Sequence, residues 1–74
     1  MQTTFSLTDR EIEIVEALSE GLSSDEISVK LLISTFTVNT HRRNAMVKMN
    51  ARNSAHLVRV CFECGVFGTV PTDY

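Results

Sequence analysis

Three polar side chains in the middle of the chain have the types and the spacing needed to recognise DNA bases. Asn39, Thr40 and Arg43 stand at positions i, i+1 and i+4, so in a helix they project together from one side. Arginine makes a bidentate contact with guanine, asparagine makes one with adenine, and a threonine methyl group contacts the methyl group of thymine. The spacing therefore predicts a base-reading surface. The alternative is an exposed basic helix face without a ligand.

Other side chains around this segment are suited to the DNA backbone. Hydroxyl groups at the start of a helix lie beside free backbone N–H groups, and both can hold phosphate oxygens. Lysine and arginine farther along the helix add positive charge. We expect phosphate contacts from Ser34, Thr35, Thr37, Arg42, Lys48 and Arg52.

The charge of the chain is distributed unevenly, although its net value is only −2 over 74 residues. Residues 1–26 carry one arginine against seven carboxylates, whereas residues 27–62 carry six lysines and arginines and no carboxylate. Two acidic residues follow in residues 63–74. This asymmetry is typical of a protein with one positive face for a polyanion, and it predicts that an acidic first helix points away from DNA.

Capping signals predict helices that position these residues. Thr8 and Glu11 form a capping box, Leu7 and Ile12 form a hydrophobic staple, and Gly21 ends the first helix. Ser23 or Ser24 begins a short second helix that ends near residues 32–33.

Two further helices are predicted after this pair. Ser34 begins a helix over residues 35–50, with Val38, His41, Ala45 and Met49 on its inner side. The last helix runs from residue 53 or 54 to Glu63. The fold class is therefore all-α, a four-helix bundle-like single domain spanning residues 1–74, with a core at about 6–67 and a tail at 68–74. Its second and third helices have the spacing of a helix-turn-helix.

The last helix has a wider apolar surface than one small core requires. Its apolar residues cover about 220° of the helix, whereas a single packing contact needs little more than about 100°. Self-association explains this surplus, and burial between the other three helices is the alternative. We expect a dimer interface that contains Leu57, Val60, Cys61 and Cys64.

An ordered set of residues resembles the LuxR-type, or GerE-type, helix-turn-helix domain of bacterial transcription regulators. The resemblance covers residues 6–67 without a gap. The matching residues are Leu7-Thr8, Arg10-Glu11, Gly21-Leu22-Ser23, Glu26-Ile27, Leu31, Ile33-Ser34, Thr37-Val38, His41, Asn44, Lys48-Met49 and Gly65.

The resemblance implies a four-helix domain whose second and third helices bind DNA and whose fourth helix mediates dimerisation in many relatives. It places Asn39, Thr40 and Arg43 at base-reading positions, and Thr37 and Lys48 near phosphates. Many relatives carry a basic residue where Asn39 stands, an arginine where Ser54 stands and a larger aliphatic residue where Ala45 stands. These departures affect the packing and the preferred DNA sequence.

Several other function classes are disfavoured by the sequence. The chain has no apolar run of membrane-spanning length and no signal peptide, and its two cysteines indicate a reducing cytoplasm. Cys61-Phe62-Glu63-Cys64 has C-x-x-C spacing but falls near a helix C-terminus, so we expect packing rather than redox chemistry or zinc binding. No catalytic set, cofactor motif or metal site is expected.

The sequence therefore predicts a DNA-binding transcription regulator that binds double-stranded DNA as a homodimer, with residues 35–50 in the major groove. We expect a receiver or ligand-binding domain in the full-length chain, and contact with RNA polymerase is an additional hypothesis. The alternative is that the chain is complete at this length, because some relatives are this short when complete. The alternative from another class is a small helical protein-interaction module that acts on the transcription machinery without binding DNA.

Overall fold

The computed structural model describes residues 7–65, and it has four α-helices and no strand within that range. The helices are α1 (Asp9–Ser19), α2 (Ser24–Leu31), α3 (Thr35–Met49) and α4 (Ser54–Glu63). The predicted all-α fold is confirmed, and its helix limits agree with the capping signals to within one or two residues. The predicted tail, residues 68–74, lies outside the described residues. No described helix is long and apolar enough to cross a membrane.

Each helix begins directly after a residue whose polar side chain accepts a hydrogen bond from a backbone N–H group. Thr8 and Glu11 form the predicted capping box, with N–H to oxygen distances of 3.0 and 3.1 Å. A second capping box joins Ser23 and Glu26 at the start of α2. Ser34 caps α3 and Asn53 caps α4. These hydrogen bonds span three residues, so they set the helix starts independently of the rest of the fold.

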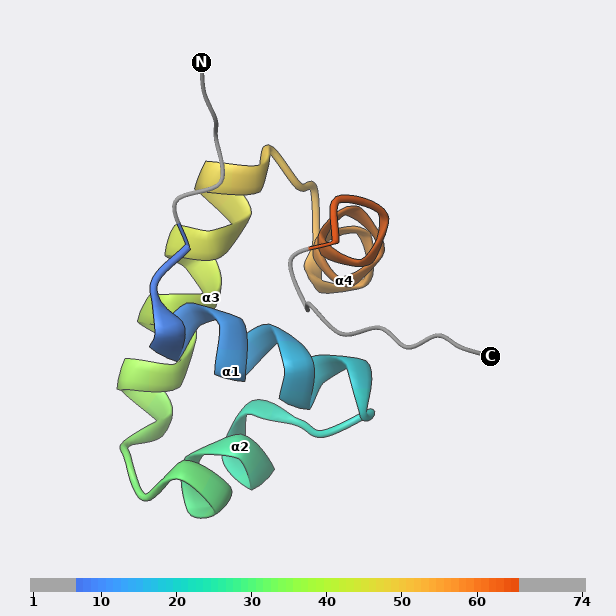
Figure 1. Cartoon of the computed structure of the whole chain (residues 1–74). Coiled ribbons are helices and arrows are strands. Elements are labelled where there is room, and N and C mark those ends of the chain that lie inside the picture. The colour runs from blue at the N-terminus through green and yellow to red at the C-terminus, as the bar shows by residue number, and fades with distance from the viewer. Residues whose placement is uncertain (1–6, 66–74) are drawn as a thin grey trace.

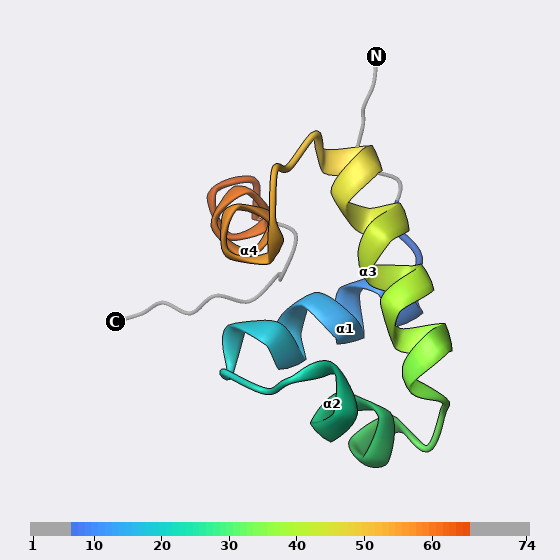
Figure 2. The same cartoon turned by 180° about the vertical axis from the view of Figure 1, so that it is seen from behind.

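α1 lies at the centre of the fold and contacts each of the other three helices. Figures 1 and 2 show α2 and α4 on different sides of α1, and α3 beside α1 with its first turns toward α2 and its last turns toward α4. Within residues 7–65, α2 and α4 make no contact with each other. α2 and α3 are joined by a short turn and pack together, which gives the helix-turn-helix that the sequence predicts.

Two clusters of buried side chains fix the rotation of α3. Val38 belongs to a cluster with side chains of α1 and α2, and Ala45 belongs to a cluster with side chains of α1 and α4. The two residues are seven apart, so they lie within about 20° of each other around the helix. The side of α3 opposite Val38 and Ala45 therefore faces away from the protein.

Leu32, in the turn between α2 and α3, has an unfavourable backbone conformation. Its φ of 60° and ψ of 43° are left-handed, and the side chain is 89% exposed. The left-handed conformation costs a residue with a Cβ atom about 1–2 kcal/mol, and little packing offsets this cost here.

Leu32→Gly is therefore expected to raise the free energy of unfolding by about 1 kcal/mol, since glycine adopts this conformation without a Cβ clash. Urea denaturation followed by helical circular dichroism measures the change. Leu32→Ala is the matched control, because it removes the exposed side chain and keeps the Cβ atom. Equal stabilisation by alanine and glycine would show that backbone strain is not the cause.

Candidate nucleic-acid interface

Thr40 and Arg43 lie on the outward side of α3, as the sequence predicts. The Arg43 side chain is exposed and makes no hydrogen bond or ion pair with any part of residues 7–65. Thr40 Oγ1 donates to the carbonyl oxygen of Phe36 at 3.0 Å, so the hydroxyl proton is used within the helix. Arg43 thus offers a full set of donors, and Thr40 offers its methyl group for an apolar contact.

Asn39 is held against α2, which limits the contact predicted for it. Its Oδ1 atom accepts from Ser24 Oγ at 2.8 Å and from Arg42 Nη2 at 3.3 Å. A bidentate contact with adenine needs this carbonyl oxygen as the acceptor from the base amine. Both lone pairs are engaged in the structure, so only the amide N–H groups of Asn39 remain for DNA. A bidentate contact with adenine would require Asn39 Oδ1 to release one of these hydrogen bonds, and the base contact of Asn39 stays a prediction.

Arg42, for which a phosphate contact is predicted, lies between helices in this structure. Its Nη1 atom donates to Ser54 Oγ at 3.1 Å, and its Nη2 atom donates to Asn39 Oδ1. Its Nε atom is buried without a hydrogen-bond partner in the described part of the chain. The guanidinium group thus joins α3 to α4. The helix periodicity of α3 does not reveal this contact, because Ser54 belongs to α4.

Lys48 also has a structural partner instead of a free ammonium group. Its Nζ atom lies 2.8 Å from Glu11 Oε1, and the Glu11 side chain is only 3% exposed. Burial alone raises the pKa of the Glu11 carboxyl, but the Lys48 ammonium, the Thr8 N–H and the charge of His41 together lower that pKa below its ordinary value of 4.5. Glu11 thus has a second role besides the capping box, as the partner of a basic residue 37 positions away. A contact between Lys48 and phosphate, which the sequence predicts, would compete with this ion pair.

Hydroxyl groups at the start of α3 are already engaged by protein atoms. Ser34 Oγ accepts from the Thr37 N–H at 3.0 Å and donates to Thr37 Oγ1 at 2.9 Å. Thr35 Oγ1 donates to Asp25 Oδ1 at 3.1 Å, which brings a carboxylate of α2 to the α3 N-terminus. A phosphate at Thr35 would have to displace this carboxylate. The sequence did not reveal this contact, because Asp25 lies ten residues away on another helix.

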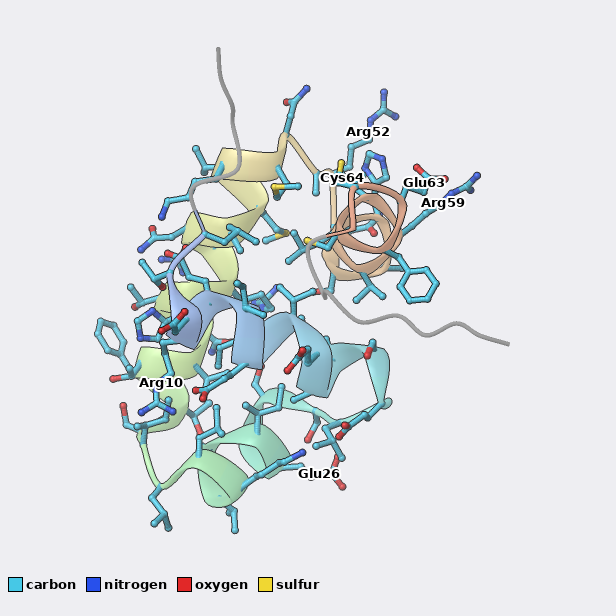
Figure 3. The ribbon with its side chains drawn as sticks, in the orientation of Figure 1. Arg10, Glu26, Arg52, Arg59, Glu63 and Cys64 are labelled. Atoms are coloured by element: carbon cyan, nitrogen blue, oxygen red, sulfur yellow. The ribbon has the colours of Figure 1, made fainter. Side chains whose placement is uncertain are left out.

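Arg43 and Arg52 line one shallow surface hollow of about 430 Å³ at the C-terminal end of α3. Figure 3 shows Arg52 pointing away from the helices beside α4. The remaining lining residues are Met46, Val47, Asn50 and Ala51.

Most other basic side chains of the described range are paired with carboxylates. Ion pairs hold Arg10, Lys30, Lys48 and Arg59, and Arg42 lies between helices. Arg43 and Arg52 are therefore the two basic residues of positions 7–65 whose guanidinium groups have neither an ion pair nor a hydrogen bond in that range. Their shared hollow is therefore the candidate site for a negatively charged ligand.

Comparison with known proteins identifies this arrangement. The family model described as "Bacterial regulatory proteins, luxR family" matches residues 5–61, which include all of α1, α2 and α3. The chain belongs to the luxR family. It is thus a DNA-binding transcription-regulator domain, and the predicted resemblance is confirmed.

Similar proteins are bacterial regulators. The transcriptional regulatory protein FixJ of Rhizobium meliloti is 41% identical over 63 residues, covering 85% of this chain and 30% of FixJ. The transcriptional regulatory protein UhpA of Escherichia coli is 39% identical over 57 residues, covering 77% of this chain and 29% of UhpA. A crystal structure of the response regulator ChrA, from a heme-sensing two-component system, matches with a TM-score of 0.78 and 32% identity, covering 85% of this chain and 31% of that one. This luxR-family domain spans about 30% of the length of these relatives.

α4 of the luxR-family domain buries two of the four residues predicted for the dimer interface. Leu57 and Cys61 are 0% exposed and pack against Val15 and Ala45 of the same chain. α1 and α3 already cover these two side chains within one chain, so Val60 and Cys64 are the predicted interface residues that remain accessible. Val60 is half-buried and Cys64 is exposed. Part of the wide apolar arc of α4 thus serves the internal core.

The two cysteines of the luxR-family domain are free thiols in different environments. Burial, with a smaller contribution from Cys64, raises the pKa of the Cys61 thiol to about 11. A buried thiol that remains protonated is a packing residue and a weak nucleophile. The packing role predicted for Cys61 is confirmed. Among residues 7–65, no group of three or more His, Cys, Asp or Glu side chains is arranged to hold a metal ion.

Phe36 is a residue of the outward α3 surface that the sequence reasoning missed. Its side chain is 79% exposed in the first turn of α3. Helical spacing alone could have revealed it, since it stands four residues before Thr40 and seven before Arg43.

Proposed function

We propose that α3 enters the major groove of double-stranded DNA, with Arg43 contacting guanine and the Thr40 methyl group contacting thymine. The observation that carries this proposal is the pair of unpartnered cations, Arg43 and Arg52, at one hollow on the outward side of α3. They belong to a stretch of 36 residues, 27–62, that has no carboxylate. Arg52 contacts the phosphate backbone beside the groove.

The other predicted phosphate contacts have smaller parts in this proposal. Backbone N–H groups at the α3 N-terminus, near Ser34, Thr35 and Thr37, face one phosphate. Arg42 supports the position of α3 through its hydrogen bond to Ser54 of α4. Lys48 adds less positive potential than an unpaired lysine would, because the Glu11 carboxylate partly neutralises its charge. The activity is binding without catalysis, and its place is the cytoplasm, where a bacterial chromosome is found.

Selection from a random duplex library tests DNA binding. We expect enrichment of one sequence, followed by a linear fall of log affinity against log salt concentration with a slope of about −0.9 for each phosphate neutralised. A scrambled duplex of equal length is the control. Failure to enrich any sequence, together with tight binding to a bacterial protein, would favour the alternative of a protein-interaction module.

We further propose that the chain dimerises through the outer side of α4. Phe62 is 70% exposed there, and Cys64 and part of Val60 are also accessible. Two-fold symmetry would place two α3 helices on half-sites about one turn of DNA apart. In the longer protein, a receiver domain preceding this one regulates the dimer, and RNA polymerase is a further partner.

Phe62→Glu is expected to weaken self-association on DNA at least tenfold, because it places a charge in an apolar contact. Sedimentation with a full-length site and with a half-site measures the number of chains bound. Val29→Glu, at an exposed position of α2 with no contact to α4, is the matched control. One chain per full site in the parent protein would contradict the dimer.

A further inference from the structure

Phe36 exposes a large aromatic ring next to the proposed DNA contacts. The side chain is 79% exposed and makes no ring contact with residues 7–65. Burial of a phenylalanine side chain is strongly favourable, so this ring leaves a considerable apolar contribution unused in the free protein. Single exposed apolar residues are common, and exposure alone assigns no role.

The position of Phe36 around α3 supplies the second observation. Seven residues separate it from Arg43, so the two side chains lie within about 20° around the helix and about 10 Å apart along it. Thr40 lies between them, about 40° from Phe36. Val38 and Ala45 fix the opposite side of α3 in the core. A groove that receives Arg43 and Thr40 must therefore receive Phe36 as well.

The chemistry of the major groove then restricts what Phe36 contacts. A phenyl ring cannot satisfy the donors and acceptors on base edges, and a polar edge left unpaired beside it weakens binding. The C5 methyl group of thymine is the one apolar group that the four bases present there. The first turn of a recognition helix is the part that contacts bases.

We propose that Phe36 is a specificity-determining residue that selects thymine by contact with its C5 methyl group. The distance of about 10 Å along α3 corresponds to about three base-pair steps of 3.4 Å, which separates this thymine from the guanine contacted by Arg43. This inference rests on the proposed function, because it needs α3 in the major groove. It adds an apolar contact to the hydrogen-bonding contacts of the same surface.

Replacement of single thymines by deoxyuridine in the selected site tests the inference, because it removes only the methyl group. In the parent protein we expect about a fourfold loss of affinity at the thymine that Phe36 contacts, the value of one buried methyl or methylene group, and a separate loss at the thymine that Thr40 contacts. With Phe36→Ala, deoxyuridine at the first of these thymines should change affinity less than 1.5-fold. Phe36→Leu keeps an apolar side chain and should retain most of the discrimination.

Two control variants test whether the effect is specific to Phe36. Thr40→Ser removes the other methyl contact, and it should abolish the deoxyuridine effect at a different thymine. Val29→Ala, at an exposed apolar position of α2, should leave every effect unchanged. Neither substitution changes a fully buried residue, and helical circular dichroism verifies the folding of both variants.

The outcomes distinguish this inference from the proposed function. If the parent protein selects a sequence and Arg43→Ala relaxes it, but Phe36→Ala retains the parent response to deoxyuridine, the Phe36 inference is wrong and the proposed function stands. If no deoxyuridine substitution affects the parent, the inference is equally wrong. If the parent selects no DNA sequence, both proposals fail together.

Discussion

Arg43→Ala is expected to reduce discrimination against the wrong base at one position of each half-site by about 1–3 kcal/mol, which is about 5- to 150-fold in affinity. The Arg43 guanidinium has no internal partner in the described chain, so its removal leaves no buried group unpaired and should not unfold the domain. Binding titrations with the selected duplex and its single-base variants measure the loss.

Arg52→Ala is the matched control for this prediction, since both arginines line the same hollow and each substitution removes one positive charge. A phosphate contact carries no sequence information, so Arg52→Ala should weaken binding to all duplexes alike and reduce the salt slope by about one. If the two variants lose the same affinity on every duplex, Arg43 contacts the backbone and the base-reading assignment fails.

Lys48→Met is expected to lower the free energy of unfolding by about 3 kcal/mol, the low end for breaking a buried ion pair on one side. The substitution leaves the buried Glu11 carboxylate without its ammonium partner at 2.8 Å. Glu11→Gln should cost only about 1 kcal/mol, because a neutral amide still accepts hydrogen bonds. The Lys48 side chain, 35% exposed, can also reach water when Glu11 is neutral. Urea denaturation of the three proteins measures both values.

The pH dependence of stability checks the same ion pair. The Glu11 pKa is lower in the folded chain than its ordinary value of 4.5, so the unfolded chain binds more protons between the two values. The contribution of ionised Glu11 to the free energy of unfolding is therefore fully present above about pH 4.5. It is lost as the pH falls through the pKa of Glu11 in the folded chain. Glu11→Gln should remove this contribution.

Lys30→Met breaks an ion pair with Glu20 in which both side chains are at least half exposed. It should cost well under 1 kcal/mol, because water screens such a pair. Equal effects of Lys30→Met and Lys48→Met would show that burial of Glu11 does not matter.

Features that depend on neighbours three or four residues away were predictable from the sequence. The Thr8–Glu11 capping box, the Ser34 cap and Gly21 each fix a helix end through local backbone geometry. The outward position of Thr40 and Arg43 followed from their spacing relative to Val38 and Ala45. The ordered motif then identified the luxR family, since its residues lie along nearly the whole chain.

The roles of the other polar residues depended on atoms far away in the sequence. Lys48 pairs with Glu11 across 37 residues, Asn39 accepts from Ser24 across 15, and Arg42 reaches Ser54 across 12. Periodicity gives the direction of a side chain from its own helix but not the partner it meets there. The sequence by itself determined the helices, their order and the positive stretch, because these arise from local geometry and composition. The tertiary structure alone decided which basic residues have no ion pair within residues 7–65 and which apolar residues of α4 are exposed, because packing between distant helices satisfies or covers the others.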